Sequence, residues 1–288
     1  MGIKQRIYEA IRVITTYISP ELNTRMCYKV RFGRKLDLNR PQTLNEKILW
    51  LKLNTYMNNP LIKQCADKYR VREYIVKKGC SELLNDVYGV YDSLEDIDWD
   101  KLPSKFVIKF NTGWGANLVC IDKGKLDLEK TSRIIKSWFK CNFYAGYSQM
   151  QYKDVEPKII IEKFLGDEKN NLPEDYKFMC INGKAEYVMV CIGRGTTNTK
   201  YCLYDRQWNW HKFDKSCPND PLIAKPTKID EAFEYADLLS SEFPFVRTDL
   251  YIIGENIYFG ELTFTPCAGL DNAIFPEVDK AIGDMIKL

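Results

Sequence analysis

The sequence predicts an α+β fold in which antiparallel sheets form two or three lobes. Strand-like segments follow one another in runs with few helices between them, a pattern typical of α+β proteins. Residues 175–192, "DYKFMCINGKAEYVMVCI", read as two apolar strands joined by Asn182-Gly183, which is the strongest hairpin signal in the chain. A length of 288 residues is enough for more than one lobe.

The elements can be assigned in order along the chain. The first sixty residues are predicted to be helical and irregular, with a Thr43-x-x-Glu46 capping box before an apolar stripe. One helix is expected over residues 59–79, ending near Gly79. Strands are expected at residues 86–91, 105–111, 117–121, 158–165, 175–192 (the hairpin), 201–210 and 246–264 (a second hairpin), with helices at 128–143 and 228–243. No internal repeat interrupts this order.

Composition narrows the class of protein. With 45% hydrophobic and 28% charged residues the chain is typical of soluble globular proteins, and a net charge of +3 is too small to indicate nucleic acid. No segment approaches a membrane span and no secretory cleavage pattern follows the start, so we expect a cytoplasmic protein. Ten cysteines without a C-x-x-C pair favour reduced thiols over disulfides or zinc. The one histidine, His211, is predicted to be structural.

The N-terminal segment is basic and amphipathic. Residues 1–36 carry eight Lys or Arg against two Glu, and isoleucines recur at helical spacing at positions 3, 7, 11, 14 and 18. Two interpretations stay open. The helix lies on an anionic membrane surface, or it packs on its own domain with a solvated basic face.

The second hairpin carries two acids, Asp249 and Glu261. A three-residue loop with Asn256 in the left-handed conformation places them opposite each other on one face. Like charges there are destabilising unless a hard cation such as Mg²⁺ binds them. The alternative is a two-residue Gly254-Glu255 turn, which slips the register by one residue and sends the acids to opposite faces.

A glycine-rich loop follows the strand at residues 105–111. In "FVIKFNTGWGANLVC" Lys109 lies on the strand, and Gly113 and Gly115 lie in the loop. Glycines let backbone N–H groups approach an anion, and a lysine adds a charge suited to phosphate. The loop is not a P-loop or a dinucleotide fingerprint, and a plain hairpin is the alternative.

Several motifs taken together resemble the ATP-grasp superfamily of carboxylate-amine ligases. The series is similar to that of D-alanine ligases and spans about residues 60 to 275: Asp67-Lys68, Lys109 with Gly113 and Gly115, Glu162-Lys163-Phe164-Leu165, Arg247-x-Asp249 and Glu261-x-Thr263-x-x-Pro266. A closer likeness, to the TupA-type branch, lies in "TLNEKILWLKL", "CADKYRVREYI", "DYKFMCINGK" and "YFGELTFTP". That branch is associated with surface polysaccharides.

The resemblance implies an ATP-grasp fold, two α+β lobes that clasp ATP between antiparallel sheets, with a helical N-terminal extension. It implies four segments: 1–60, a basic helical region for acceptor or membrane contact; 61–104, part of the N-terminal lobe; 105–165, a lid with the glycine-rich loop; and 166–288, the C-terminal lobe with the Mg²⁺ site.

The resemblance also implies how ATP is held. Lys68 and Lys109 would hold the α- and β-phosphates, and the loop over the triphosphate would be Thr112, Gly113, Trp114, Gly115 and Asn117. The adenine would be held by Glu162 and by the backbone of Lys163 and Leu165.

Metal and catalytic residues follow from the same likeness. Asp249 and Glu261 would bind Mg²⁺, with Thr263 where the superfamily usually has asparagine. Arg247 would face the transferring phosphoryl group, where a fork of donors suits developing negative charge. Lys177 and Arg194 would neutralise phosphate or bind the acceptor, and two solvated strand residues are the alternative.

The reaction implied is ATP-dependent amide formation through an acyl phosphate, which needs no histidine base. The expected substrates are a uronic acid on a sugar or glycan and an amino acid or amine. Acceptor contacts are expected in the N-terminal region, at Arg31, Arg34, Lys35, Arg40 and Lys47.

Three other functions remain open. A glycosyltransferase would use a D-x-D metal motif, for which Asp96, Asp98 and Asp100 are candidates, although a surface turn suits these acids better. A sugar kinase would use the same phosphate-binding residues. A non-catalytic module for polysaccharide assembly would not bind ATP.

Overall fold

A computed structural model describes residues 2–193 and 199–288. The helices are α1 (Ile3–Ile18), α2 (Pro20–Phe32), α3 (Leu44–Leu51), α4 (Pro60–Ala66), α5 (Val71–Lys77), α6 (Leu128–Phe139), α7 (Ile229–Ser240) and α8 (Pro276–Met285). The strands are β1 (Val87–Tyr91), β2 (Phe106–Phe110), β3 (Asn117–Cys120), β4 (Ile159–Lys163), β5 (Asp175–Ile181), β6 (Lys184–Ile192), β7 (Lys200–Asp205), β8 (Trp210–His211), β9 (Phe245–Ile253) and β10 (Asn256–Thr263).

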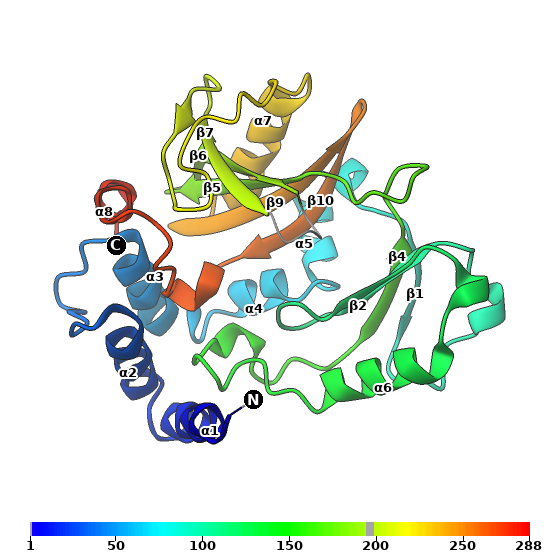
Figure 1. Cartoon of the computed structure of the whole chain (residues 1–288), viewed down its shortest axis with the longest axis horizontal. Helices are drawn as coiled ribbons and strands as arrows, with labels where there is room; N and C mark the ends of the chain where they lie inside the picture. Colours follow the sequence, from blue (N-terminus) through cyan, green and yellow to red (C-terminus); the bar gives the residue numbers. More distant parts are fainter. Residues whose placement is uncertain (1, 194–198) are drawn as a thin grey trace.

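The strands form two antiparallel sheets, as an α+β fold requires. One has four strands in the order β1-β4-β2-β3, and the other has six in the order β10-β9-β5-β6-β7-β8. Figure 1 shows the smaller sheet with α6 on one side of the molecule, the larger sheet with α7 beside it, and helices α1 to α3 with α8 at the opposite end. In the described part of the chain no helix has the length and apolar character of a membrane span.

Each sheet has its own apolar core. The smaller core packs Phe106, Ile108 and Phe110 of β2 against β4 and α6. The larger core packs the six-stranded sheet against α7 on one side and includes side chains of α4 and α5. The region between the two sheets is therefore lined by residues from two separately packed units. The four-segment division of the chain stays a prediction.

The β9–β10 hairpin has a register that neither sequence interpretation describes. Asn256 pairs with Ile253, so the turn has two residues, and Gly254 rather than Asn256 has a positive φ, of 59°. A β-bulge between Phe259 and Glu261 then adds one residue to β10. The short turn alone would have placed Glu261 on the opposite face from Asp249. The extra residue of the bulge returns Glu261 to the face of Asp249, and the two acids lie opposite each other, as the three-residue alternative predicted.

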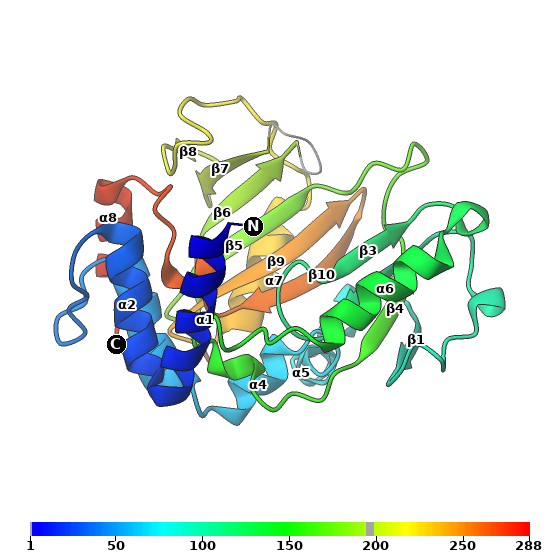
Figure 2. The same cartoon turned by 60° about the horizontal axis from the view of Figure 1, so that its bottom comes forward.

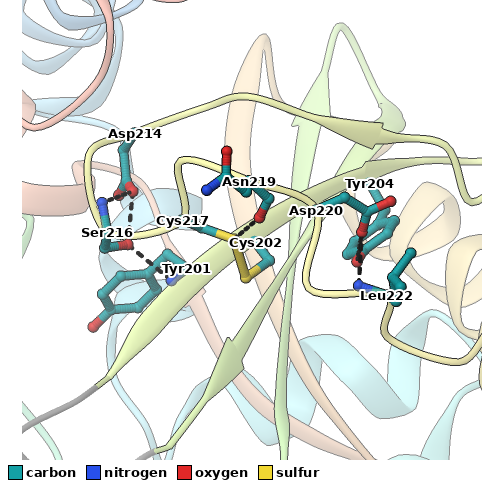
Figure 3. Close-up of a disulfide and its surroundings, with 9 residues drawn as sticks. All are labelled: Tyr201, Cys202, Tyr204, Asp214, Ser216, Cys217, Asn219, Asp220 and Leu222. Carbon is teal, nitrogen blue, oxygen red and sulfur yellow. Dashed lines mark hydrogen bonds between the residues drawn. A yellow bond between two sulfur atoms is a disulfide. The ribbon is translucent and has the colours of Figure 1, made fainter.

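The prediction of only reduced cysteines is wrong, because Cys202 and Cys217 form a disulfide (Figure 3). The chain beyond β8 folds back over β7 and brings the two Cα atoms to 5.5 Å. This distance suits a disulfide, and the fold of the intervening loop creates it. A spacing of 15 residues does not reveal such a return of the chain.

One helix differs from expectation. The helix expected at residues 59–79 breaks at Asp67, whose backbone is extended and whose carboxylate accepts hydrogen bonds from the N–H groups of Tyr69 and Arg70. Asp67 is the C-cap residue of α4, and its carboxylate stabilises the turn that leads into α5. The capping box at Thr43 and Glu46 is present as predicted at the start of α3.

Candidate functional site

The centre of the candidate site is the paired acids of β9 and β10. The Arg247 guanidinium donates to both oxygens of Asp249 at 2.7 Å, and its Nη2 also reaches Glu261 Oε1 at 3.2 Å. A planar guanidinium suits such a bidentate contact. One cation thus lies between the two carboxylates and removes the repulsion that their register creates.

Lys177 supplies a second cation from the neighbouring strand β5. Its ammonium lies 2.6 Å from Asp249 Oδ2 and 2.5 Å from Asp175 Oδ2. The alternative of a solvated strand residue is wrong for Lys177, because it is largely buried and paired in the acid cluster. Arg194, the other residue predicted beside it, lies outside the described residues.

Thr263 completes the group on β10. Its hydroxyl donates to Glu261 Oε1 at 2.9 Å and accepts from Arg247 Nη2 at 3.2 Å. Among the described residues no three His, Cys, Asp or Glu side chains form a metal cluster. Two carboxylates and a hydroxyl are nevertheless the hard oxygen ligands that Mg²⁺ takes, and Mg²⁺ usually completes its shell with water and substrate phosphates. The donors present therefore fit the predicted ion.

Charge around Glu261 keeps this acid ionised. Burial by itself raises the pKa of the Glu261 carboxyl. Nearby cations outweigh burial and hold that pKa at about 2, and they are Lys68, Arg247 and Lys177. At neutral pH the site therefore offers a carboxylate surrounded by positive charge, an arrangement suited to a metal ion bridged to phosphate.

The glycine-rich loop lies against this cluster. Gly113 and Gly115 have φ of 78° and 70°, in the left-handed region that favours glycine. A Cβ at Gly113 would lie 2.1 Å from the Phe143 ring, so this position also lacks room for a side chain. Lys68 Nζ donates to the Gly113 carbonyl at 2.6 Å and ties the loop to the segment between α4 and α5.

Lys109 and Glu162 form an ion pair between β2 and β4, with Nζ and Oε2 2.6 Å apart. Burial lowers the pKa of Lys109, but the Glu162 carboxylate outweighs burial and the net pKa is raised. The lysine is therefore charged. Both residues line a small cavity of about 100 Å³, here called the Lys109 cavity, together with Asn117, Lys163 and Leu165. Six of its lining residues belong to the strands β2, β3 and β4 of the smaller sheet, and one, Tyr251, comes from β9.

Two larger cavities meet at Arg247. The Glu261 cavity, about 370 Å³, is lined by Gly113 and Trp114 of the loop and by Glu261 and Thr263. The Lys177 cavity, about 580 Å³, lies on the other side of Arg247, over β5, β6 and β7. Arg247, Pro266 and Cys267 line both cavities and form their common boundary.

The structure brings most predicted residues together. The nucleotide residues line the Lys109 and Glu261 cavities or contact the loop, while Thr112 is buried beside it. Three of the five N-terminal acceptor candidates make contacts within the protein, and their role stays a prediction: Arg34 pairs with Glu46 at 2.6 Å, and Lys47 donates to the Ile286 carbonyl at 2.7 Å. Arg31 donates to the Leu270 carbonyl at 3.0 Å.

Several residues that line the cavities were not predicted from the sequence. Tyr152 and Gln149 line the Glu261 cavity, and Asp214, Asp271 and Cys267 line the Lys177 cavity. Cys267 and Ala268 have positive φ, an unusual conformation for two successive residues with side chains. The only signal for Cys267 was its position just after the Thr263 motif.

The D-x-D acids of the rival glycosyltransferase function lie elsewhere. Asp98 pairs with Lys101 at 2.8 Å on the surface, and Asp96 accepts from Ser93, as a surface turn predicts. His211 contacts Asp205 at 3.0 Å on the edge strand β8 and is structural, as expected.

The structure has two antiparallel lobes, and between them lie the lysines Lys68 and Lys109, a glycine-rich loop and a pair of acids. This arrangement is the one expected of the ATP-grasp class. Residues 46–287 match the family described as TupA-like ATPgrasp. The chain belongs to this family, and the predictions of an ATP-grasp α+β fold and of the TupA-like branch are confirmed. No curated protein matches it in sequence.

Solved structures with a similar fold are distant in sequence. D-alanine–D-alanine ligase from Bacillus anthracis, complexed with ATP, is 16% identical with a TM-score of 0.48, over 77% of this chain and 65% of that one. L-amino acid ligase from Bacillus licheniformis is 14% identical with a TM-score of 0.49, over 80% and 51%. This chain thus spans about half to two thirds of the length of these proteins.

Proposed function

We propose that this protein is an ATP-dependent ligase that forms an amide through an acyl phosphate. Its substrates are an amino acid or amine and a uronic acid of a surface polysaccharide or its precursor, and it acts in the cytoplasm. The observation that carries the proposal is the position of Arg247. This arginine bridges the acid pair and borders both the Glu261 cavity and the Lys177 cavity.

The nucleotide is assigned to the Lys109 and Glu261 cavities. The adenine would lie beside the backbone of Lys163 and Leu165. The triphosphate would then point toward the glycine-rich loop, where Lys68 contacts Gly113. Lys109 is charged in its pair with Glu162 and is suited to phosphate. The residues from both sheets that surround this path support a nucleotide held between the lobes.

Mg²⁺ would be held by Asp249, Glu261 and the Thr263 hydroxyl. When bound, it would offset phosphate charge and orient the transferring group. Arg247 and Lys177 already contact Asp249, and their positive charges would add to that of Mg²⁺ in offsetting the phosphate charge. Their donors are fixed before reaction, and preorganised donors are the most effective way to stabilise developing negative charge.

The carboxylate substrate is assigned to the Lys177 cavity. At about 580 Å³ it is within the range of sites for small molecules, and its walls combine apolar residues with a few charged ones. Arg247, which also lines the Glu261 cavity, and Lys177, which shares Asp249 with it, would hold a carboxylate toward the γ-phosphate. Asp214 and Asp271 are at other walls, where carboxylates suit an ammonium or sugar hydroxyls.

The reaction then proceeds by positioning and charge. A substrate carboxylate oxygen attacks the γ-phosphorus and ADP leaves. The amine then attacks the acyl carbon of the acyl phosphate, and inorganic phosphate leaves with the amide formed. The amine nitrogen loses its extra protons to solvent or phosphate during this step. Little covalent work falls to the protein, which agrees with a site without histidine.

The test is ATP turnover with Mg²⁺ across uronic acids and nucleotide-linked uronates crossed with amino acids, with products weighed by mass spectrometry. The expected result is ADP formed only with both partners present, and a product lighter than their sum by one water. Glu261→Gln should lower turnover at least about 100-fold, since it removes one charge at the transferring phosphate.

Asp98→Asn is the matched control. It makes a similar carboxylate-to-amide change on a surface acid far from the cavities, and turnover should stay unchanged. A phosphate ester as product would show a sugar kinase instead. Consumption of a nucleotide sugar without ATP would show a glycosyltransferase and overturn the assignment of the acid pair.

A further inference from the structure

Helix α1 presents its apolar side to solvent. Ile7, Ile11, Ile14 and Ile18 follow one another at helical spacing, and each side chain is 42% to 69% exposed. A helix on the surface of a globular protein normally turns such a stripe toward the core. The stripe in α1 has the opposite orientation, so the interpretation in which it packs on its own domain does not account for it.

The polar side of α1 is the side that packs on the protein. The Thr16 hydroxyl, which is buried, contacts the Ala145 carbonyl at 2.5 Å and Ser148 Oγ at 2.8 Å. The Arg12 guanidinium lies 4.3 Å from the centre of the Tyr147 ring. These contacts are specific and fix the rotation of the helix about its axis. The exposure of the isoleucines is therefore built into the fold.

Basic residues border the apolar stripe. At 3.6 residues per turn, Lys4 and Arg6 lie on its two borders, and both are exposed. The adjacent helix α2 adds the exposed Val30 and Lys29.

The acids of the two helices do not offset this charge. Glu9 lies 3.9 Å from Arg12, and Glu21 lies 2.7 Å from Arg25. The exposed residues of α1 and α2 thus combine an apolar stripe with an excess of positive charge.

This surface lies at the edge of the molecule. Figure 1 shows α1 at the lower edge, and in Figure 2, where that edge comes forward, α1 is in front with α2 beside it. Both helices precede residue 46, where the match to the TupA-like family begins. The surface is therefore an addition to the matched part of the chain, and no contact of the catalytic cluster requires its isoleucines.

We propose that α1 binds the surface of an anionic phospholipid bilayer, lying in the plane of the interface with its isoleucines in the acyl boundary. Burial of the isoleucines removes apolar surface from water, and Lys4, Arg6 and Lys29 interact with lipid phosphates. Charge decides between possible occupants. A protein partner would need acids around an apolar groove, whereas an anionic membrane offers both properties over its whole surface.

The surface also has a route to the candidate site, and this part rests on the proposed function. A cavity of about 370 Å³, the Arg31 cavity, lies between Tyr8, Val30 and Arg31 and the segment after β10. It shares Tyr147 and Cys267 with the Glu261 cavity, and Cys267 and Asp271 with the Lys177 cavity. A protein docked through α1 would have this cavity beside the membrane, where a lipid-linked glycan enters.

Vesicle binding by the full chain tests the proposal without any assay of activity. The protein is mixed with phosphatidylcholine vesicles, with and without phosphatidylglycerol, and the bound fraction is measured by flotation. Binding is expected only with phosphatidylglycerol and should weaken as salt rises. Ile11→Asn and Ile14→Asn should each weaken it about tenfold, because one buried isoleucine contributes roughly that factor.

Controls separate the apolar and the charge contributions. Leu222→Asn alters a side chain that is 84% exposed elsewhere and should leave vesicle binding unchanged. Lys4→Glu should reduce binding, whereas Lys101→Glu, far from α1, should not. Circular dichroism checks that the variants are folded. We expect them to be folded, because the substituted side chains are exposed. No binding to anionic vesicles, equal binding to neutral ones, or a dimer dissolved by Ile11→Asn would each overturn the proposal.

Discussion

At the scale of single residues, the candidate site is a set of opposite charges that satisfy one another. Asp249 is almost fully buried and accepts from Arg247 and Lys177, while Glu261 is more exposed and faces the loop. Buried acids of this kind are costly unless paired, and removal of one partner leaves the other unpaired. Mutation of Arg247 or Lys177 is therefore expected to affect stability as well as chemistry.

Lys52 is a buried charge outside the candidate site, and it predicts a pH dependence of stability. Its side chain is about 2% exposed and Nζ donates to the Tyr147 carbonyl at 2.9 Å. Burial lowers the pKa of Lys52 to about 7. Between that pH and the ordinary lysine pKa the unfolded chain binds more protons than the folded chain. The free energy of unfolding due to Lys52 should therefore rise with pH, by about 1.4 kcal/mol per unit.

The measurement is urea unfolding of the wild type and of Lys52→Met between pH 7 and 8.5. The difference between them isolates Lys52 from the other titrating groups, which both proteins share. We expect the wild type to gain stability relative to the variant as pH rises. Lys29→Met, at an exposed position of α2, should show no such gain. A difference that does not change with pH would mean that Lys52 stays charged.

Most residues that contact one another in the site come from motifs visible in the sequence. Asp249, Glu261 and Lys109 could be assigned because they stand in motifs that resemble those of ATP-grasp ligases, whereas strand alternation alone left two registers open for the two acids. Tyr152 and Cys267 could not, because they come from irregular segments whose path depends on tertiary packing. The disulfide is a similar case, since a loop that returns to β7 leaves no local signal.

At the scale of elements, the β9–β10 hairpin depends on its bulge. A Cβ at Gly260 would lie 2.9 Å from the Asp249 carbonyl oxygen, so the bulge requires glycine for close approach. The sequence left the turn length open, because the two-residue Gly254-Glu255 turn and a three-residue loop are both compatible with it, and the structure has the two-residue turn. The two acids nevertheless face each other, as the three-residue alternative had predicted, because the bulge compensates for the shorter turn.

Gly260→Ala is expected to destabilise the protein by roughly 1–3 kcal/mol, since the extra methyl group moves the strand that carries Glu261. Chemical unfolding measures this change, and ATP turnover should fall with it. Gly146→Ala is the matched control, because its Cβ would meet no atom within 4 Å. If both glycines tolerate alanine equally, the bulge does not need the close approach inferred for Gly260.

At the scale of the whole molecule, each of the two sheets has its own apolar core, and residues of both sheets line one candidate site. The fold class could be predicted because runs of strands and one strong turn identify antiparallel sheets. How the sheets face each other could not, because no local pattern encodes contacts such as that between Lys68 and the Gly113 carbonyl. The same limit applies to α1, whose stripe was visible in the sequence but whose outward orientation was not.

A nucleotide bound between the two cores should stabilise both. Because the Lys109 cavity is lined by β2, β4 and Tyr251, Mg²⁺-ATP is expected to slow hydrogen exchange in residues 112–117, in β4 and in β10. At ATP near 100 times its Kd, amides that exchange through release of the nucleotide should slow about 100-fold. Lys109→Met should lose most of this protection, whereas Lys101→Met, on the surface, should keep it. Protection confined to the four-stranded sheet would show that ATP binds one lobe only and that the acid pair of β9 and β10 does not contact its phosphates.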